Sequence, residues 1–172
     1  VMGVPKKERG RIADDHIRAM KAIWSDHPAS YHGEYVTFDD ASICPKPLQQ
    51  PNPPLWIGGW TEHAMRRTAH LGDGWLPAWL LPPDIGRKFQ EVREMAATAG
   101  RDPDAIHLGF EPYACIDEDD ARARADGYGT LAIGQSTFER LMSVEQLTAV
   151  SLIGSPDAIC RQVEAYAAAG VS

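Results

Sequence analysis

Hydrophobic residues along the chain gather in short runs that alternate with longer stretches of helical spacing. Three short runs are predicted strands: "LWIGG" (55–59), which shows no polar alternation, "DGWLPAW" (73–79) and "AIHLGFEPYACI" (105–116). Runs without alternation are typical of parallel strands that are buried on both faces. Stretches 61–72 and 82–100 between them place apolar residues on one helical face. This order predicts an α/β fold with βα repeats and about three parallel strands.

The chain before these repeats is predicted to form a helix and a hairpin. Apolar residues recur at helical spacing over 8–24, and Asp15 is expected on another face of that helix. The segment at about 31–45 holds strand-forming residues around Asp39 and Asp40, a polar pair that resembles a turn. We therefore expect a short hairpin, followed by a proline-rich segment that leads into the first buried run.

The last third of the chain carries helix signals of uneven strength. An acidic stretch at 117–120 predicts a solvated helix start, and this helix is expected to dissolve into the glycines that follow. The segment 137–150 is expected to be helical. "GSPDAICRQVEAYAAAG" (154–170) predicts a clearer helix, with Ser155 as its N-cap and Pro156 at its first position.

Charge and composition narrow the classes of partner. The net charge is −7 and the isoelectric point is near 5.3, which argues against nucleic acid and anionic membranes, since phosphates attract basic faces. No apolar run approaches the roughly 20 residues of a membrane span. Three widely spaced cysteines indicate neither a disulfide framework nor a metal site. We therefore predict a cytoplasmic protein with no nucleic-acid or membrane partner.

The glycine pair that ends the first run is a candidate anion site. Gly58 and Gly59 stand between a predicted strand and a helix for which Thr61 is the expected N-cap. Without side chains, this backbone lets a ligand come close to the unpaired amides of the helix start, where the dipole favours an anion. Arg66 or Arg67 would add charge if the helix face is right. The alternative is a pair of turn glycines required only by packing.

The wider pattern resembles a known family. Its landmarks are "YHGEYVTF", then P-x-P-x-Q-x-P-x-P-P-x-W-I-G-G, then "GDGWLP" and the terminal "GSPD…AYAAAGV". In this order they resemble the luciferase-like monooxygenases, a family of flavin and deazaflavin enzymes, and especially the branch that uses coenzyme F-420. The resemblance covers most of the chain. It implies a (β/α)8 TIM barrel with an inserted hairpin, in which residues 1–172 form a single domain.

The resemblance also implies cofactor-binding residues. The "LWIGG" strand would be the fifth of the barrel, and its loop would hold the phosphate of FMN or coenzyme F-420. Gly58, Gly59, Trp60 and Thr61 match that loop, although Trp60 departs from the small or polar residue that is usual there. Of the two tryptophans that flank "LPA", one is expected to pack under the helices and the other to wall the pocket; Trp75 is taken as a cofactor contact.

A barrel of this class typically needs about 250 residues. The resemblance matches this chain to strands five to seven only, so we expect an incomplete barrel: a fragment, a truncated product, or half of a split or intertwined assembly. A missing amino-terminal half or a homo-oligomer is therefore the expected partner. The residues around the flavin ring commonly come from the absent strands, and a complete active site within this chain is not expected.

Within the chain, two residues are weak catalytic candidates. Glu111 and Tyr113 are expected near the carboxyl end of the third run, where barrel enzymes place their sites. The alternative for Glu111 is a structural carboxylate tied to a neighbouring arginine. No pair of histidines has the spacing of metal ligands.

Three hypotheses follow. The first is an oxidoreductase or monooxygenase, or part of one, that acts on a small organic molecule with reduced FMN or coenzyme F-420. The second is a non-catalytic barrel fragment that binds flavin or pairs with a sister subunit. The third is an unrelated phosphate-binding βα protein, such as a sugar-phosphate enzyme, against which the hairpin and the last helix count.

Overall fold

The structure, a computed structural model, describes residues 5–25, 28–138 and 143–172. Its helices are α1 (Arg9–Ser25), α2 (Glu62–Leu71), α3 (Pro82–Thr98), α4 (Asp120–Phe138), α5 (Val144–Ala149) and α6 (Pro156–Ala168), with a 3-10 turn at Pro103–Ala105. Its strands are β1 (Ala29–His32), β2 (Thr37–Ala41), β3 (Trp56–Gly58), β4 (Gly74–Leu76), β5 (His107–Leu108), β6 (Ala114–Ile116) and β7 (Leu152–Gly154).

The predicted parallel strands are present and pair in sequence order. β3, β4 and β5 form one parallel sheet, in which Trp56 lies opposite Gly74 and Trp75 opposite Leu108. The third run, predicted as one strand region, is divided around Pro112 into β5 and β6. Its second part, β6, pairs with β7 instead. The segment from β5 to β6 therefore connects the two parallel sheets: its first part pairs with β4 and its second part pairs with β7.

The structure adds a parallel strand to the predicted three. β7 is only three residues long and pairs in register with β6, with Cys115 opposite Ile153. A run this short has no measurable period, so its pairing rather than its sequence pattern defines it. The prediction of about three parallel strands therefore missed the short strand β7.

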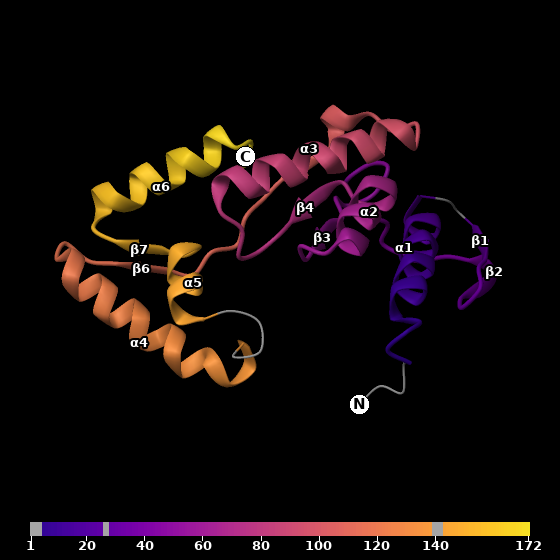
Figure 1. Ribbon diagram of the computed structural model, residues 1–172. Coiled ribbons are helices and arrows are strands. Elements are labelled where there is room, and N and C mark those ends of the chain that lie inside the picture. The colour runs from indigo at the N-terminus through magenta and orange to yellow at the C-terminus, as the bar shows by residue number, and fades with distance from the viewer. Residues whose placement is uncertain (1–4, 26–27, 139–142) are drawn as a thin grey trace.

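Helices flank the parallel strands (Figure 1). α2 packs against β3 and α3, and β6 and β7 run between α6 on one side and α4 on the other. Tyr166 of α6 enters the main core, where its ring stacks on Phe110 at 4.2 Å between centroids and its hydroxyl donates to the Leu80 carbonyl. Burial raises the pKa of Tyr166 to about 12. This tyrosine joins the last βα unit to the first sheet.

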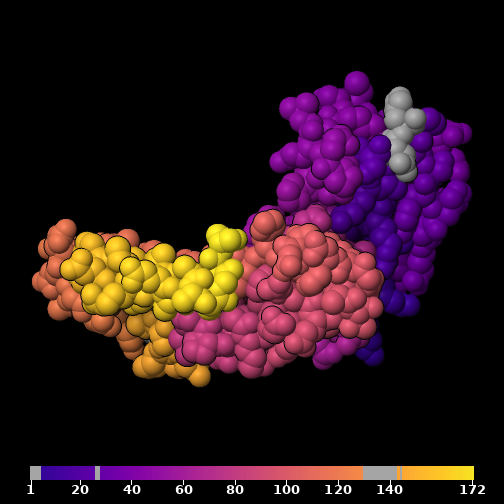
Figure 2. Space-filling view, turned by 90° about the horizontal axis from the view of Figure 1, so that it is seen from above, coloured from indigo at the N-terminus to yellow at the C-terminus, as the bar shows by residue number. Residues whose placement is uncertain are grey.

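The molecule is elongated and bent (Figure 2). Its accessible surface is 10595 Å², whereas a compact monomer of this mass exposes about 8300 Å². Among the described residues, β3 and β7 each have one strand neighbour, so the strands do not close on themselves. Trp56 and Ile116 remain 44% and 56% exposed on the strands. Apolar side chains on the strands are therefore open to solvent.

The hairpin is present, with different bounds and a different turn. It spans Ala29–Ala41 rather than 31–45, and its turn is formed by Gly33 and the residues after it, where the Gly33 amide donates to the Val36 carbonyl at 2.8 Å. Asp39 and Asp40 lie inside β2, so the prediction of a turn there was wrong. An exposed strand accepts polar residues as readily as a turn does.

Asp15 departs from its predicted surface position. Its side chain is buried on α1, where its carboxylate accepts hydrogen bonds from the Tyr31 hydroxyl at 2.6 Å and from the backbone amides of Tyr35 and Val36. These bonds, the one from Tyr31 first, lower the pKa of Asp15 below its ordinary value. One carboxylate therefore fastens the hairpin turn to the helix.

Two further helix predictions needed adjustment. The acidic helix does not dissolve at its glycines: α4 continues through Gly127, where a Cβ would lie 2.8 Å from an Ile153 methyl, so the glycine permits close packing on β7. Of the predicted helix 137–150, residues 139–142 lie outside the described residues, and α5 forms its second part. In the described ranges, none of the helices is both long and apolar enough to cross a membrane.

Candidate anion and cofactor site

The loop after β3 is fixed by β4. Gly59 has a φ of +104°, a backbone conformation that suits glycine. Its amide donates to the Leu76 carbonyl at 3.3 Å, and its carbonyl accepts a 2.8 Å hydrogen bond from the indole N–H of Trp75. Both backbone polar groups of Gly59 are therefore hydrogen-bonded to β4, and the loop has a defined shape.

No side chain covers the glycine pair. A Cβ built on Gly58 would meet nothing nearer than the Leu76 carbonyl oxygen at 3.9 Å, and one on Gly59 would touch Ala64 at 3.4 Å. A ligand can therefore approach the Gly58 backbone closely.

Thr61 caps α2, as predicted. Its hydroxyl accepts from the Ala64 amide at 3.3 Å, and the first intrahelical bond runs from the Met65 amide to the Thr61 carbonyl. The amides of Glu62 and His63 precede that bond and belong to the positive end of the helix dipole. The capped helix start and the glycine pair together form a seat for an anion.

This seat opens into a cavity of about 920 Å³ between α1 and α2. Gly58, Gly59 and Thr61 line it, together with His63 and His70 of α2. Seven of the 17 Lys and Arg side chains of the chain line it too, against one carboxylate, that of Asp14. These seven are Lys6, Lys7, Arg9, Arg11, Arg18, Arg66 and Arg67. In a chain of net charge −7, this cavity is a concentrated basic region.

The two arginines suggested from the sequence line the cavity but have protein partners. Arg67 pairs with Asp14 of α1 and donates to the Gly10 carbonyl at 3.0 Å. Arg66 pairs with Glu62 at 2.5 Å along the exposed face of α2. Arg67 thus joins α1 to α2, and neither guanidinium is free of carboxylates.

Of the two tryptophans that flank "LPA", one is packed under the helices as predicted, and the other, Trp79, is half-buried against Leu147 and Ile153 and does not line the cavity. Trp75 is fully buried in the main core and reaches the loop only through its indole N–H. Its side chain therefore supports Gly59 from behind and does not contact the open space, contrary to its assignment as a cofactor contact. Trp79 faces Trp60, with ring centroids 4.8 Å apart. Trp79 has a φ of +59°, which is strained for a bulky residue.

The structure does not bring the two catalytic candidates to this cavity. Glu111 and Tyr113 are exposed in the irregular segment between β5 and β6, and the extended run continues to Ile116. They therefore lie in the connection between two strands, after β5 ends at Leu108 and before β6 begins at Ala114. Neither is among the described residues that line the cavity.

The sequence analysis missed the basic wall of α1. Lys6, Lys7 and Arg9 come from "KKERGR" (6–11), a cluster that stands out in an acidic chain. That cluster was the available signal, but its position opposite the glycine loop depends on how α1 packs on α2. In the described part of the chain, His, Cys, Asp and Glu side chains nowhere gather in a group of three or more that could hold a metal ion.

The family model for luciferase-like monooxygenases matches residues 1–172. The chain belongs to this family. Among curated relatives, the FMNH2-dependent dimethylsulfone monooxygenase of Pseudomonas putida is 27% identical over 191 residues, which cover 95% of this chain and 52% of that protein. An uncharacterised protein of Mycobacterium tuberculosis is 33% identical over 113 residues, covering 64% of this chain and 39% of the relative. The chain spans about half the length of the curated relatives it matches, or less.

Solved structures agree on the fold. An F-420-dependent secondary alcohol dehydrogenase, in complex with an F-420–acetone adduct, matches with a TM-score of 0.81 at 19% identity, over 99% of this chain and 57% of that one. The coenzyme F-420-dependent tetrahydromethanopterin reductase of Methanopyrus kandleri matches with a TM-score of 0.70 at 21% identity, over 92% and 55%. The α/β fold therefore matches the luciferase-like TIM-barrel structures, in a family with FMN- and F-420-dependent members.

Proposed function

We propose that this chain is the cofactor-phosphate-binding part of an oxidoreductase that uses reduced FMN or coenzyme F-420 on a small organic substrate. The observation that carries the proposal is the uncovered Gly58 backbone at the end of β3, which opens to a basic cavity just before α2 begins. A phosphate there would accept hydrogen bonds from the first-turn amides and lie at the positive end of the helix. The names of the relatives support the reaction class.

In this proposal the chain's own residues bind and orient. Gly58, Gly59 and Thr61 would hold the phosphate, Trp75 would keep the loop rigid, and Trp60 with Trp79 would limit the space beside it. When bound, the reduced ring supplies a hydride or activates oxygen. We assign no proton-transfer step to Glu111 or Tyr113, because neither lies at the seat.

Substitution of Gly58 by Ala tests the site. A Cβ at this position meets no atom nearer than 3.9 Å, so the variant is expected to fold normally while its methyl group covers the seat. Titration of the complete natural polypeptide with FMN and with coenzyme F-420 should show an affinity loss of about tenfold or more, equivalent to 1.4 kcal/mol. Gly129→Ala on α4, where a Cβ also meets nothing within 4 Å, is the matched control. If the Gly58→Ala variant binds both cofactors with unchanged affinity, the Gly58–Thr61 loop does not hold the cofactor phosphate.

A second candidate is a non-catalytic fragment that pairs with another barrel half. The surface in excess of a compact monomer and the open edges of β3 and β7 favour it, because unpaired strand edges recruit further strands. Under this candidate the chain would be an incomplete barrel that needs a complementary set of βα units, either in the same polypeptide or in a second copy. Light scattering combined with substrate turnover by the purified chain separates the two: a monomer that turns over substrate would exclude the fragment.

A further inference from the structure

The basic cavity carries more positive charge than one phosphate seat needs. Among the cations that line it, Arg66 pairs with Glu62, Arg67 with Asp14, and Arg11 with Glu34. Lys6, Lys7, Arg9 and Arg18 form no ion pair with any of the described residues. Glu8, which lies between Lys7 and Arg9 in the sequence, does not line the cavity. Four cations therefore remain without a carboxylate partner on the wall formed by α1.

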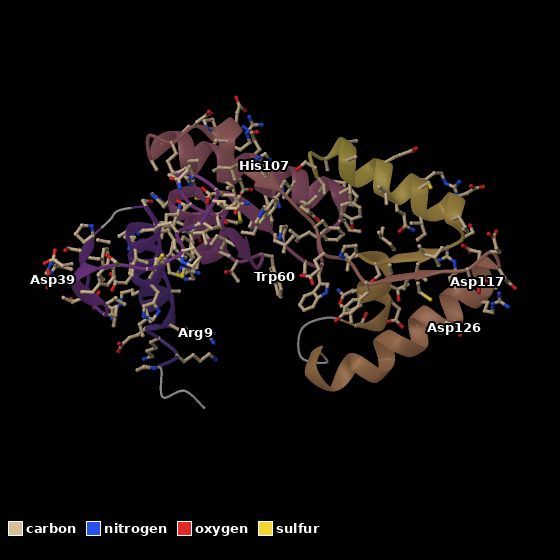
Figure 3. All side chains as sticks on the ribbon, turned by 180° about the vertical axis from the view of Figure 1, so that it is seen from behind. Arg9, Asp39, Trp60, His107, Asp117 and Asp126 are labelled. Carbon is tan, nitrogen blue, oxygen red and sulfur yellow. The ribbon has the colours of Figure 1, made fainter. Side chains whose placement is uncertain are left out.

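These cations extend away from the seat. Lys6 and Lys7 lie in the turn before α1 and Arg9 is its first residue. Arg18 follows nine residues later, which is about 13 Å along a helix axis. Figure 3 shows Arg9 at the lower end of α1 and Trp60, the residue that follows the glycine pair, nearer the middle of the molecule. The cavity, at about 920 Å³, lies near the upper end of the range of 300–1000 Å³ that ligand pockets span. Its size and its charge both fit an extended anion.

We propose that the α1 wall binds a second anionic group of the ligand whose phosphate occupies the Gly58–Thr61 seat, so that the site selects a polyanionic side chain. This inference rests on the proposed function and deepens it. FMN ends at its phosphate and would leave the α1 cations unused. The side chain of coenzyme F-420 continues beyond its phosphodiester as a chain of glutamate carboxylates, which supplies the chemistry that lysine and arginine side chains bind. The charge distribution therefore favours the deazaflavin.

The test combines variants with ligands of graded charge. Lys6, Lys7 and Arg9 are exposed, so the triple variant K6Q/K7Q/R9Q is expected to keep the fold, which circular dichroism verifies. The control R87Q/K88Q/R93Q removes the same charge from α3, outside this cavity. Fluorescence titration of the complete natural polypeptide uses riboflavin, FMN, the deazaflavin without glutamates and coenzyme F-420 with its glutamate chain, each at low and at physiological salt.

The expected result is specific to the tail. The cavity triple variant should bind glutamylated F-420 about tenfold or more weakly, because each exposed ion pair contributes up to about fivefold, while its affinity for FMN and for the glutamate-free deazaflavin changes less than about twofold. The control variant should bind all four ligands normally. Equal weakening of all anionic ligands, or no weakening, would overturn the second subsite and leave the phosphate seat intact. A parent protein that binds none of the four would overturn the proposed function as well.

Discussion

The indole N–H of Trp75 donates to the carbonyl oxygen of Gly59 across 2.8 Å, from a ring that is fully buried in the main core. The bond joins β4 to the loop that follows β3, which is the loop with the uncovered glycine backbone. Packing of one tryptophan under the helices therefore determines the shape of the proposed anion seat on the other side. Support of this kind, from a residue that does not touch the ligand, gives an anion site its rigidity.

Replacement of Trp75 by Phe tests this support. Phe retains one six-membered ring and removes the donor, so the Gly59 carbonyl loses its partner, at a cost of about 1–2 kcal/mol in the free energy of unfolding. The smaller side chain also leaves a cavity at this fully buried position, which adds to that cost. FMN affinity should fall as well, since the loop is no longer fixed. Urea denaturation and ligand titration measure the two effects. Trp56→Phe is the control, because the Trp56 ring is 44% exposed and lies at the other end of β3 from the loop. If the Trp75 and Trp56 variants bind FMN with the same affinity, Trp75 does not position the loop.

A second substitution addresses the backbone of the same loop. Gly59 has a φ of +104° and its Cβ position lies 3.4 Å from Ala64, so Gly59→Ala should destabilise the fold by about 1–3 kcal/mol. Gly58→Ala carries neither constraint and should leave the urea midpoint nearly unchanged. The difference between the two variants measures the strain. Equal midpoints would show that the loop relaxes to another conformation.

The Asp15 carboxylate predicts a pH dependence of stability. Its pKa is lowered in the folded chain, chiefly by the hydrogen bond from Tyr31, so its contribution is fully present above the ordinary aspartate pKa and is lost as the pH falls through the folded pKa. Asp15→Asn should lower the urea midpoint at neutral pH, because an amide cannot accept all three hydrogen bonds. The gap between parent and variant should narrow as acid protonates the parent, and a gap that stays constant with pH would contradict this assignment.

Tyr166 predicts the strength of the link between the last βα unit and the first sheet. Tyr166→Phe keeps the ring on Phe110 but removes the 2.9 Å hydrogen bond to Leu80, at a cost of about 1 kcal/mol in the free energy of unfolding. Tyr128→Phe, at a 46% exposed position, is the control.

The same residue gives a spectroscopic test. Burial raises the pKa of Tyr166 to about 12, and the pKa values of Tyr31 and Tyr35 are raised as well. Several tyrosines should therefore ionise late in an ultraviolet titration, and the Tyr166→Phe variant should show one fewer of them than the parent. Because the unfolded chain ionises first, stability should fall as the pH rises from about 10 toward the folded value. Early ionisation of every tyrosine would show that Tyr166 is exposed in solution.

The sequence by itself determined the alternation of strands and helices, the capping of α2 by Thr61 and the family. Each of these depends on local spacing: a continuous apolar run, a helical stripe or a hydroxyl before a first turn is readable wherever it stands. The glycine pair was also readable from the sequence, because the absence of a side chain indicates a place where a ligand can approach the backbone, whatever residues lie nearby. The hydrophobic pattern also predicted that one of the two tryptophans near "LPA" would be packed.

Only the tertiary structure decided the rest, because those features depend on what lies opposite in space. Asp15 is buried since the hairpin turn places three donors around it, and β7 is a strand only because β6 pairs with it. Trp75 supports Gly59 from behind because β4 lies beside β3. The basic wall of α1 faces the seat for a similar reason: residues more than 40 positions apart in sequence line one cavity once α1 packs on α2.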